Sequence, residues 1–407
     1  MSITHAGSRL VIGILTGAAA PALAQTDSIV IRAGTLLDGR GGSRGPTDIV
    51  IRGSKIGALR APAGTPTYDL SGLTVMPGGI DTHIHLLDHF DSTGRSAQRT
   101  PETPQQIVLY GMENAWLTLQ AGITTAQSLG DLLDREVRDA IARGHAPGPR
   151  IITSLDWVVG DTTTPIDSLV ATVRARVAAG ADAVKIFASK SIREGGGPTL
   201  TEAQLKAACD EAAARGRRSV VHAHAAEAVK RAARAGCTTV EHGGLVDDAA
   251  LDLMAQRGTF FDPNVHLVLQ NYFDNRAKFI GIGNYTAEGF AHMERLKPAM
   301  VEVFRKALAR PNLKTLFGTD AVAGAHGRNW EELIFRVEKG GQAPMAAIVS
   351  ATSLAARSLG LEKEIGAVAP GLEADLIGMP GNPATQITAL RSVRFVMRGG
   401  KVYRNTR

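Results

Sequence analysis

Residues 218–243 read RSVVHAHAAEAVKRAARAGCTTVEHG, and this stretch decides the fold. Two runs, Ser219–His224 and Thr238–Gly243, have the length and the apolar, β-branched content of buried strands. Between them, Ala225–Ala235 has the composition of a helix and is followed by Gly236, a residue type that commonly ends helices. A strand, a helix and a second strand in this order predict one unit of a parallel sheet covered by helices.

The same alternation extends along the chain from about residue 79. Further helices are predicted at residues 166–179, 200–215 and 247–256. The eight predicted strands are Gly79–Leu86, Ile123–Leu129, Arg150–Leu155, Ala183–Ser189, Ser219–His224, Thr238–Gly243, Thr259–Val265 and Thr315–Ala321. Eight strands that alternate with helices over about 285 residues predict an α/β fold, a (β/α)8 TIM barrel. The alternative, an open doubly wound sheet, would require a glycine-rich phosphate loop after an early strand, and the sequence has none.

Both ends of the chain have a different sequence pattern, with short apolar runs separated by glycine- and proline-rich turns. Such runs occur within residues 28–76 and again within residues 366–402. Neither end alone has enough strands to bury a core. We therefore predict one small β-sandwich domain built from residues 25–78 and 365–407, beside a barrel domain of residues 79–364.

The first 24 residues predict export. An apolar run from Val11 is followed by Ala22 and Ala24, the small-residue spacing of a signal-peptide cleavage site. The run is shorter than the roughly 20 residues that a membrane span needs. We expect residues 1–24 to be a cleaved signal peptide and the mature protein to be periplasmic or secreted, without a membrane segment.

Composition excludes some classes of function. Lys and Arg number 45 against 39 Asp and Glu, and the resulting net charge of +6 is spread along the chain. Because no basic block interleaved with aromatic residues occurs, we expect no nucleic-acid partner. Cys209 and Cys237 could pair outside the cytosol, but they fall in a predicted helix and at the start of a predicted strand, so we expect two buried free thiols. The oligomeric state is left open, with a homo-oligomer as one option.

Ionisable side chains gather at the carboxyl ends of the predicted strands, where barrel enzymes build their active sites. His83 and His85 lie two residues apart at the end of the first strand, so both side chains face the same way. The others are Lys185, His222, His242 and Asp320, at the ends of the fourth, fifth, sixth and eighth strands. Neutral imidazoles and carboxylates are ligands for Zn²⁺ and similar ions. The pattern therefore predicts a metal site, whereas the His-x-His pair alone would fit hydrogen-bonded core histidines equally well.

Lys185 is unusual among these residues, because an isolated ammonium is costly to bury. Two interpretations follow. Either a carboxylate neutralises the ammonium, or the amine has reacted with CO₂ to form a carbamate that bridges two cations.

The motifs resemble those of the amidohydrolase superfamily. They are His83-x-His85 after Pro77-Gly-Gly-Ile-Asp, then Lys185, His222, Glu241-His242-Gly, Gly318-Thr-Asp320 and the tail Pro370-Gly-Leu-Glu-Ala-Asp-Leu. Among its subgroups the chain is most similar to the metal-dependent Xaa-Pro dipeptidases and carboxypeptidases, which include ochratoxin-hydrolysing amidohydrolases. Imidazolonepropionase-like enzymes are more distant relatives.

The resemblance implies a hydrolase of C–N bonds with two divalent metal ions, Zn²⁺ first among them. His83, His85 and Asp320 would hold one ion, His222 and His242 the other, and carboxylated Lys185 would bridge both. Asp320 would act as general base and then general acid on a dipeptide or an N-acyl amino acid. A cyclic amide, imide or lactone hydrolase is the alternative within the same fold, and an exported binding protein on an inactive barrel is the alternative outside enzymes.

His224 requires separate treatment, because it faces the same way as His222. A strand rise of about 3.3 Å per residue would put the two roughly 6–7 Å apart, too far to share one ion. The resemblance puts the metal ligand at His222, so we expect His222 to bind metal and His224 to contact the substrate. Lower-ranked candidates for the substrate pocket are Lys190 and Arg193 after the fourth strand, and His326 and Arg328 after the eighth.

Overall fold

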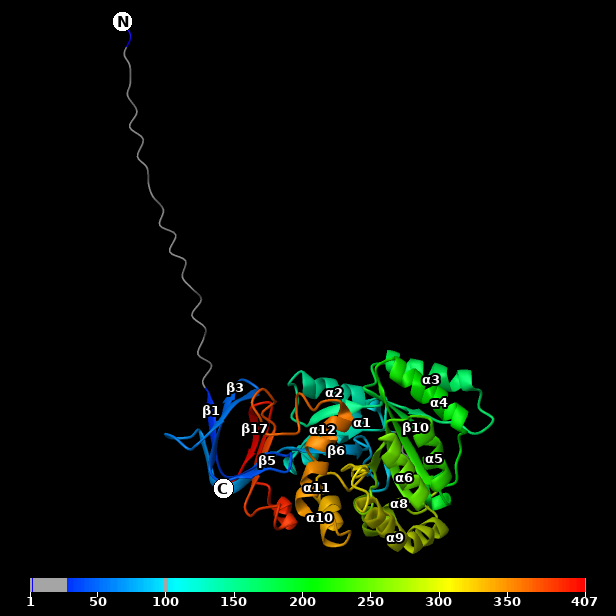
Figure 1. The fold of residues 1–407 in the computed structure, drawn as a ribbon. Coiled ribbons are helices and arrows are strands. Elements are labelled where there is room, and N and C mark those ends of the chain that lie inside the picture. Colours follow the sequence, from blue (N-terminus) through cyan, green and yellow to red (C-terminus); the bar gives the residue numbers. More distant parts are fainter. Residues whose placement is uncertain (1, 3–27, 98–101, 407) are drawn as a thin grey trace.

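The computed structural model describes residues 2, 28–97 and 102–406. The predicted signal peptide, apart from residue 2, lies outside the described residues. Strands from the two ends of the chain form a sheet on one side of the molecule, and alternating strands and helices form the other side (Figure 1). No helix among the described residues is long and apolar enough to cross a membrane.

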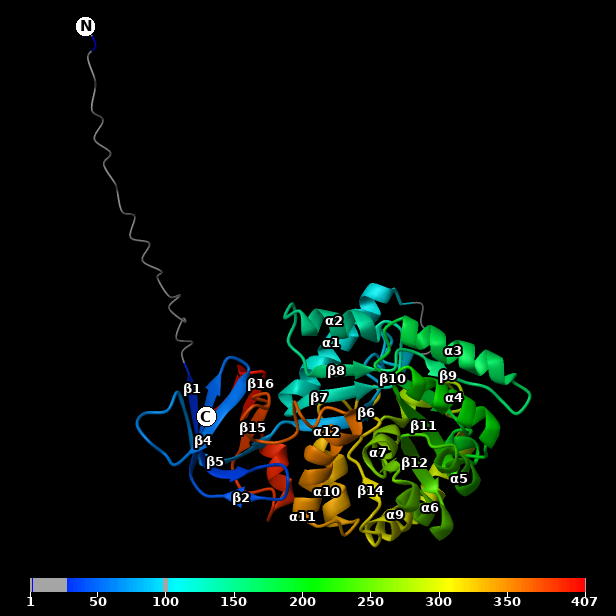
Figure 2. The ribbon, with the colours of Figure 1, turned by 45° about the horizontal axis from the view of Figure 1, so that its top comes forward.

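The central strands follow the predicted order, with one short strand added. They are β6 (Gly79–Ile84), β7 (Ile123–Ser128), β8 (Arg150–Thr153), β9 (Trp157–Val158), β10 (Ala183–Phe187), β11 (Arg218–Ala225), β12 (Thr239–Leu245), β13 (Phe260–Asp262) and β14 (Lys314–Thr315). All pair in parallel, in two sheets: β6-β7-β8 and β14-β13-β12-β11-β10-β9 (Figure 2). Their carboxyl ends consequently face the same side.

Isolated backbone contacts connect the two sheets at both edges. A parallel bridge joins Ile84 at the end of β6 to Ala321, and the amide of His85 donates to the carbonyl of Ala321 at 2.8 Å. At the other edge the amide of Asp182 donates to the carbonyl of Thr153 at 2.7 Å. These contacts bring the first and eighth predicted strands side by side, although the paired strands form two sheets rather than one continuous ladder.

The eighth predicted strand is shorter than expected, and β14 ends five residues before Asp320. Asp320 adopts a φ of +53°, which an extended strand does not contain. Instead, carbonyls on either side of it accept hydrogen bonds from β6 and its end: Phe317 from Thr82 and Ala321 from His85. The segment therefore stays beside β6 without regular pairing.

Helices cover the outside of the central strands (Figures 1 and 2). The predicted helices correspond to α3, α4, α5 and α6, and capping residues begin several of them: Thr201 and Gln204 form a capping box on α4, and Asp247 caps α6. The helices are α1 (Pro104–Gln120), α2 (Asp134–Ala142), α3 (Ile166–Ala178), α4 (Glu202–Ala214), α5 (Ala226–Arg234), α6 (Asp248–Arg257), α7 (Leu267–Asp274), α8 (Arg276–Phe279), α9 (Ala287–Leu308), α10 (Trp330–Glu338), α11 (Pro344–Ser350) and α12 (Ser353–Leu359), with 3₁₀ turns η2 (Ile192–Glu194) and η3 (Ile387–Ser392).

Strands from both ends of the chain share one mixed sheet, as the composite domain requires. Its strands are β1 (Ile29–Leu37), β2 (Ser43–Arg44), β3 (Thr47–Arg52), β4 (Lys55–Arg60), β5 (Tyr68–Pro77), β15 (Leu376–Met379), β16 (Phe395–Arg398) and β17 (Lys401–Asn405). The order is β17-β16-β15-β5-β1-β3-β4, with β2 paired to β1, so β15 from the tail pairs directly with β5. The division into two layers of a sandwich stays a prediction, because the strands belong to a single sheet.

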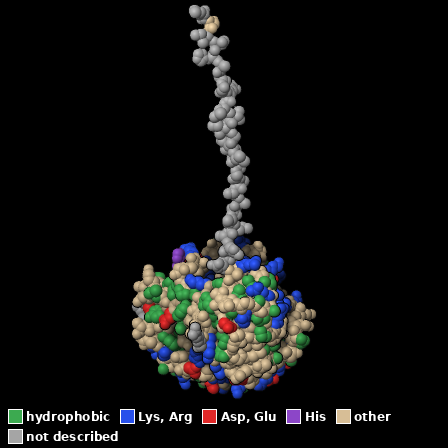
Figure 3. Space-filling model, turned by 90° about the vertical axis from the view of Figure 1, so that its left-hand side faces the viewer, with side chains coloured by type: hydrophobic (Ala, Val, Ile, Leu, Met, Phe, Trp, Pro, Cys, Tyr) green, Lys and Arg blue, Asp and Glu red, His purple; other side chains and the backbone are tan. Residues whose placement is uncertain are grey.

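The terminal sheet and the central strands share a hydrophobic core. Leu37, Met76 and Ile377 of the sheet pack in one buried cluster with Ile123 and Trp330 of the central region. Figure 3 views the molecule from the side of the terminal sheet, where Lys and Arg side chains lie scattered among uncharged ones.

The expectation of two free thiols is wrong, because Cys209 and Cys237 form a disulfide. Cys209 lies on α4, and Cys237 lies in the turn between α5 and β12. The two Cα atoms are 5.3 Å apart, within the distance that a disulfide bridges. The prediction used the position of each cysteine within its own element. It did not consider that neighbouring strand–helix units pack α4 against the turn before β12.

Candidate metal centre and substrate pocket

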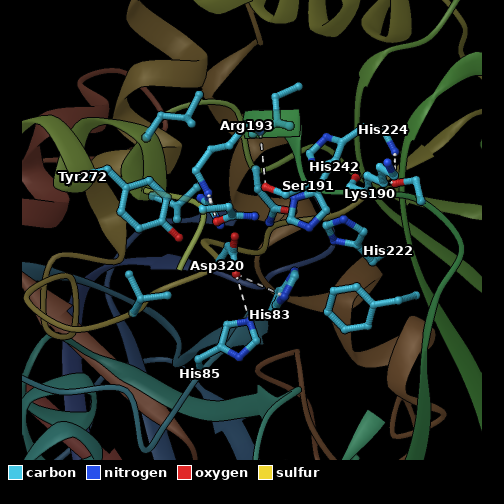
Figure 4. Close-up of a pocket in the computed structure, with 18 of the residues that line it drawn as sticks. His83, His85, Lys190, Ser191, Arg193, His222, His224, His242, Tyr272 and Asp320 are labelled. Carbon is cyan, nitrogen blue, oxygen red and sulfur yellow. Dashed lines mark hydrogen bonds and ion pairs between the residues drawn. The ribbon is translucent and has the colours of Figure 1, made fainter. Parts of the chain in front are cut away.

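A pocket of about 740 Å³ lies at the carboxyl ends of the central strands. All six predicted metal ligands line it, and so does His224. Figure 4 labels the five histidines and Asp320 among them. These side chains come from four parallel strands and from the segment after β14, so the fold brings together residues far apart in the sequence.

The first cluster consists of His83 and His85 at the end of β6 and Asp320 after β14. Asp320 Oδ1 lies 3.1 Å from His85 Nε2 and 3.3 Å from His83 Nε2. The amide of Asp320 donates to the carbonyl of His83 at 2.7 Å, which fixes the carboxylate beside the two rings. One nitrogen of each ring and one carboxylate oxygen lie within 4.8 Å of one another, close enough to hold a common metal ion.

The second cluster consists of His222 and His224 on β11 and His242 on β12. Their ligand nitrogens also lie within 4.8 Å of one another. The predicted separation of His222 and His224 is therefore wrong. Their ring centroids are only 4.8 Å apart, and His224 stacks on His242 at 4.7 Å. The pairing of β11 with β12 shifts register between Ala223 and Ala225, and the rings turn toward each other instead of staying apart along an ideal strand.

Lys185 links the two clusters from β10. Its side chain is buried, and Nζ lies 3.3 Å from His83 Nε2. Among the described residues no carboxylate oxygen lies within 4.0 Å of Nζ. Burial accordingly lowers the pKa of the Lys185 ammonium from its usual value. The first interpretation of Lys185, neutralisation by a direct carboxylate partner, therefore has no support in this part of the chain.

The environment favours the protonation states that bind metal. Burial lowers the pKa of both His83 and His224 to about 3 and lowers those of His222 and His242 well below the usual value. These four imidazoles are thus neutral at physiological pH, with a lone pair available. His85 differs: burial opposes its charged form, but the hydrogen bond and the charge of Asp320 outweigh burial and raise the pKa of His85. For Asp320 burial opposes ionisation, but the rings of His83 and His85 outweigh it and lower the pKa, so this carboxyl group is ionised.

Two of these residues have strained backbones. His242 has a φ of +71° and Asp320 a φ of +53°, a region that non-glycine residues rarely occupy. Such strain persists only where the surrounding structure enforces it, and it is common at functional sites. Here it turns the chain at His242 within β12 and at Asp320 beyond the end of β14, and both side chains line the pocket.

A layer of buried polar residues supports the ligands from below. Glu241 Oε2 accepts a hydrogen bond from His83 Nδ1 at 2.8 Å, which leaves His83 Nε2 directed toward Asp320 and Lys185. Burial raises the pKa of the Glu241 carboxyl to about 8. Asp262 accepts a short 2.5 Å bond from Thr82 beneath the first cluster. Hydrogen bonds of this kind orient ligating histidines and set their tautomer.

The residues present fit a metal centre. Imidazole nitrogens and a carboxylate are suitable ligands for divalent ions such as Zn²⁺. Furthermore, His222 Nε2 and His224 Nδ1 are buried without a hydrogen-bond partner in the described part of the chain. Buried nitrogens of this kind are unfavourable unless something binds them.

Comparison with known proteins identifies the family. The sequence model of the amidohydrolase family matches residues 74–403. The chain belongs to the amidohydrolase family. This confirms the resemblance drawn from the histidine motifs.

Several relatives of this amidohydrolase cover nearly its whole length. The chain is 24% identical to an ochratoxinase of Aspergillus niger over 94% of this chain and 88% of that protein. A crystal structure of a Xaa-Pro dipeptidase with methionine bound in its active site superposes with a TM-score of 0.82 at 30% identity, covering 93% of this chain and 100% of that one. A prolidase complexed with N-methylphosphonate-L-proline gives a TM-score of 0.82 at 25% identity, with the same coverages.

The wall of the pocket comes from connecting segments. Residues 190–194 follow β10, and Val268, Leu269 and Tyr272 belong to α7, while Asn284 and Tyr285 precede α9. Lys190 and Arg193 thus lie in the pocket, as the sequence predicted. Figure 4 shows Arg193 and Tyr272 on the opposite side of Asp320 from His85 in this view.

His326 and Arg328 lie elsewhere. They line a separate pocket together with His266 and Arg391. His326 nevertheless contacts the back of the first cluster, since its Nε2 donates to the carbonyl of His85 at 3.1 Å. The structure therefore does not place these two residues in the pocket that holds the histidine clusters.

Sequence reasoning missed Trp157, Tyr272, Tyr285 and Asn264 of the pocket. Asn264 is the most informative, because its side-chain Oδ1 is buried without a partner in the described residues and its φ is +42°. Its position two residues after the end of β13 was a usable signal, since strand ends of this sheet build the site. The two tyrosines lie far from any strand end and gave no such signal.

Proposed function

We propose that this amidohydrolase cleaves the amide bond of a dipeptide or an N-acyl amino acid with the help of two divalent metal ions. The observation that carries the proposal is the convergence of six ligand side chains, from four parallel strands and the segment after β14, on one pocket. A pocket of about 740 Å³ suits a small substrate of this class. The central strands are inferred to form one (β/α)8 barrel, and residues 1–24 a signal peptide that directs the enzyme to the periplasm or the medium.

The two clusters divide the ligands. His83, His85 and Asp320 would hold one ion, and His222 and His242 the other. Lys185, between them, would complete both sites as a carbamate: the neutral amine attacks CO₂, an N–C bond forms, and one proton leaves. A lowered ammonium pKa favours the neutral amine that this reaction needs. Zn²⁺ is the first candidate metal, because the ligands are imidazoles and carboxylates.

Metal ions in such a site polarise the scissile carbonyl and lower the pKa of bound water. Asp320, ionised and within reach of His83 and His85, would take the proton from the attacking water and deliver it to the leaving nitrogen. Glu241 holds His83 in one tautomer. His224, whose buried Nδ1 has no partner among the described residues, is proposed to orient the substrate carbonyl.

A hydrolysis screen tests the function. Zinc-loaded protein should hydrolyse N-acyl amino acids or Xaa-Pro dipeptides, and treatment with a chelator should abolish the activity. Metal analysis should give about two ions per chain, and a high-resolution crystal structure should show a carboxylated Lys185. Turnover of lactones or cyclic imides alone would support the cyclic-substrate alternative. One ion per chain with an unmodified lysine would contradict the binuclear site.

A pair of variants separates His222 from His224, which distance alone does not distinguish. The family resemblance assigns the ligand to His222, so His222→Ala should lose one ion per chain. His224→Ala should keep both ions and lose turnover or substrate affinity. Metal content of the two purified variants decides, and the reverse pattern would mean that His224 is the ligand.

A further inference from the structure

Arg193 is held at the wall of the pocket in a defined orientation. It lies in the 3₁₀ turn η2, where its own amide donates to Ser191 Oγ at 3.3 Å. Its Nε donates to Asn284 Oδ1 at 2.7 Å. The guanidinium lies 3.9 Å from the ring centroid of Tyr285 and 5.3 Å from that of Tyr272. Stacking on two aromatic rings stabilises a cation without neutralising it.

The guanidinium has no acidic partner within 4.0 Å in the described part of the chain. Many other arginines here pair with carboxylates, for example Arg32 with Asp48 at 2.9 Å. The neighbouring Glu194 forms no ion pair with Arg193 among the described residues, and its Oε2 accepts a hydrogen bond from Asn284 Nδ2 at 2.8 Å. Asn284 thus binds the arginine with its oxygen and the glutamate with its nitrogen. A guanidinium has five N–H donors, and the terminal ones can still bind a carboxylate in a bidentate manner.

The segment that carries Arg193 is held by backbone hydrogen bonds and packs against β11, the strand of His222 and His224. Lys190 N donates to Gly197 O at 2.8 Å, and Ala225 N donates to Gly196 O at 3.2 Å. Gly196 has a φ of +65°, and a Cβ there would lie 2.5 Å from the Cβ of His224. The turn therefore packs directly against a residue of the second cluster. A group bound by Arg193 would consequently have a set distance from the histidines.

We propose that Arg193 binds a free carboxylate on the substrate, so that the preferred substrates carry a carboxylate next to the scissile amide, as the C-terminal residue of a dipeptide or an N-acyl amino acid does. This inference rests on the proposed function and assigns to Arg193 the recognition of the terminal carboxylate that those substrates share. The inference rests on three observations: the guanidinium lines the pocket, it stacks on two aromatic rings, and no carboxylate among the described residues forms an ion pair with it. The side chains of Val268, Leu269 and Met300, which also line the pocket, favour an apolar residue beside that carboxylate.

The test compares an N-acyl amino acid with its carboxamide, which has nearly the same shape and no charge. The wild-type enzyme should prefer the acid in kcat/KM by about 10- to 100-fold, because a charge-assisted bidentate contact contributes about 1.5–3 kcal/mol. Arg193→Met should remove this preference, mainly through KM for the acid, with little change for the carboxamide. Arg193→Lys should restore only part of it, since an ammonium cannot form the same fork.

Two controls distinguish binding from structure. Arg217→Met removes an arginine without an acidic partner among the described residues at the opposite end of β11, and it should leave the preference unchanged. Asn284→Asp should place a carboxylate on Arg193 and weaken binding of the acid even if Arg193→Met folds poorly. Metal content should stay at the wild-type value in all variants.

Two outcomes would overturn the inference. Equal losses for the acid and the carboxamide in Arg193→Met would show a structural role for Arg193. A wild-type enzyme that hydrolyses both equally well would show that the substrate carboxylate is not recognised. If the wild-type enzyme hydrolyses neither compound nor any other amide, the proposed function itself fails, which is a separate result.

Discussion

The floor and the wall of the pocket are built in different ways. The floor consists of His83, His85, Lys185, His222, His242 and Asp320 at strand ends, and the wall of residues from the turn η2 and the segments around α7 and α9. Parallel pairing fixes Lys185, His222 and His242 relative to one another, and a backbone hydrogen bond to His83 holds Asp320 beside the first cluster. Wall residues instead depend on how connecting segments pack. The floor therefore determines what chemistry is possible, and the wall determines which molecule undergoes it.

Removing Lys185 should have the largest effect, because it lies between the two clusters. Lys185→Ala should lose one ion per chain and reduce kcat by about 10³-fold or more, since metal ions supply several kcal/mol of transition-state stabilisation. Metal analysis and steady-state kinetics on the purified variant check this. Lys230→Ala, which removes a lysine paired with Asp247 on the surface, is the matched control and should change neither quantity. Full activity in Lys185→Ala would show that the floor works without the bridge.

A Glu241 variant tests whether the hydrogen bond that orients His83 matters as much as the predicted ligands themselves. Loss of the bond to His83 Nδ1 in Glu241→Ala should reduce metal affinity or activity by about 10- to 100-fold. Glu241→Gln keeps an acceptor at the same place and should lose less. Titration of the metal-free variants with Zn²⁺ measures the difference. Equal affinities for wild type and Glu241→Ala would mean that His83 needs no partner to hold its orientation.

Asn264 lies at the boundary between floor and wall. Its Oδ1 has no partner among the described residues, and glycine tolerates the local φ of +42°, so Asn264→Gly removes the amide without backbone strain. If the oxygen binds the substrate, kcat/KM should fall about 10-fold, and the melting temperature should also fall, because the buried bond from Asn264 Nδ2 to Asp262 Oδ1 at 3.2 Å is lost. Asn382→Ala is the matched control: Asn382 lies outside this pocket, where its Oδ1 accepts from the amide of Ala384 at 2.9 Å, and its loss should leave KM unchanged.

The difference between floor and wall also explains what the sequence could predict. The motifs around His83, Lys185 and His242 gave the six candidate ligands, because strand ends of a parallel sheet must meet at one edge. The arrangement of His222 and His224 was not predictable, since it depends on a local register shift that an ideal strand lacks. The disulfide and the tyrosines of the wall depend on packing between elements distant in sequence, for which spacing within one element carries no information.

The disulfide should affect stability and leave catalysis unchanged, because it joins α4 to the turn before β12 outside the pocket. The double variant Cys209→Ala, Cys237→Ala should lose about 3–4 kcal/mol in free energy of unfolding, the value expected for a cross-link between residues 28 positions apart. Chemical denaturation with and without a reductant measures it: the reductant should destabilise the wild type and not the variant. A large fall in kcat for the variant would show that the floor depends on this link.

Replacing Arg328 should have the smallest effect on kcat/KM, because this residue lies outside the wall of the substrate pocket. It lines the second pocket, and it forms an ion pair with Asp274 at 3.0 Å in which both side chains are about two-fifths exposed. Such pairs contribute about 0–1 kcal/mol, because water and salt screen them. Arg328→Ala should therefore change kcat/KM by less than about two-fold, and Asp274→Ala should behave in the same way. Kinetics on the acid and carboxamide substrates, measured beside Arg193→Met, make the comparison direct. A rise in KM confined to Arg328→Ala would mean that the substrate reaches the second pocket and that the wall extends beyond Arg193 and the two tyrosines.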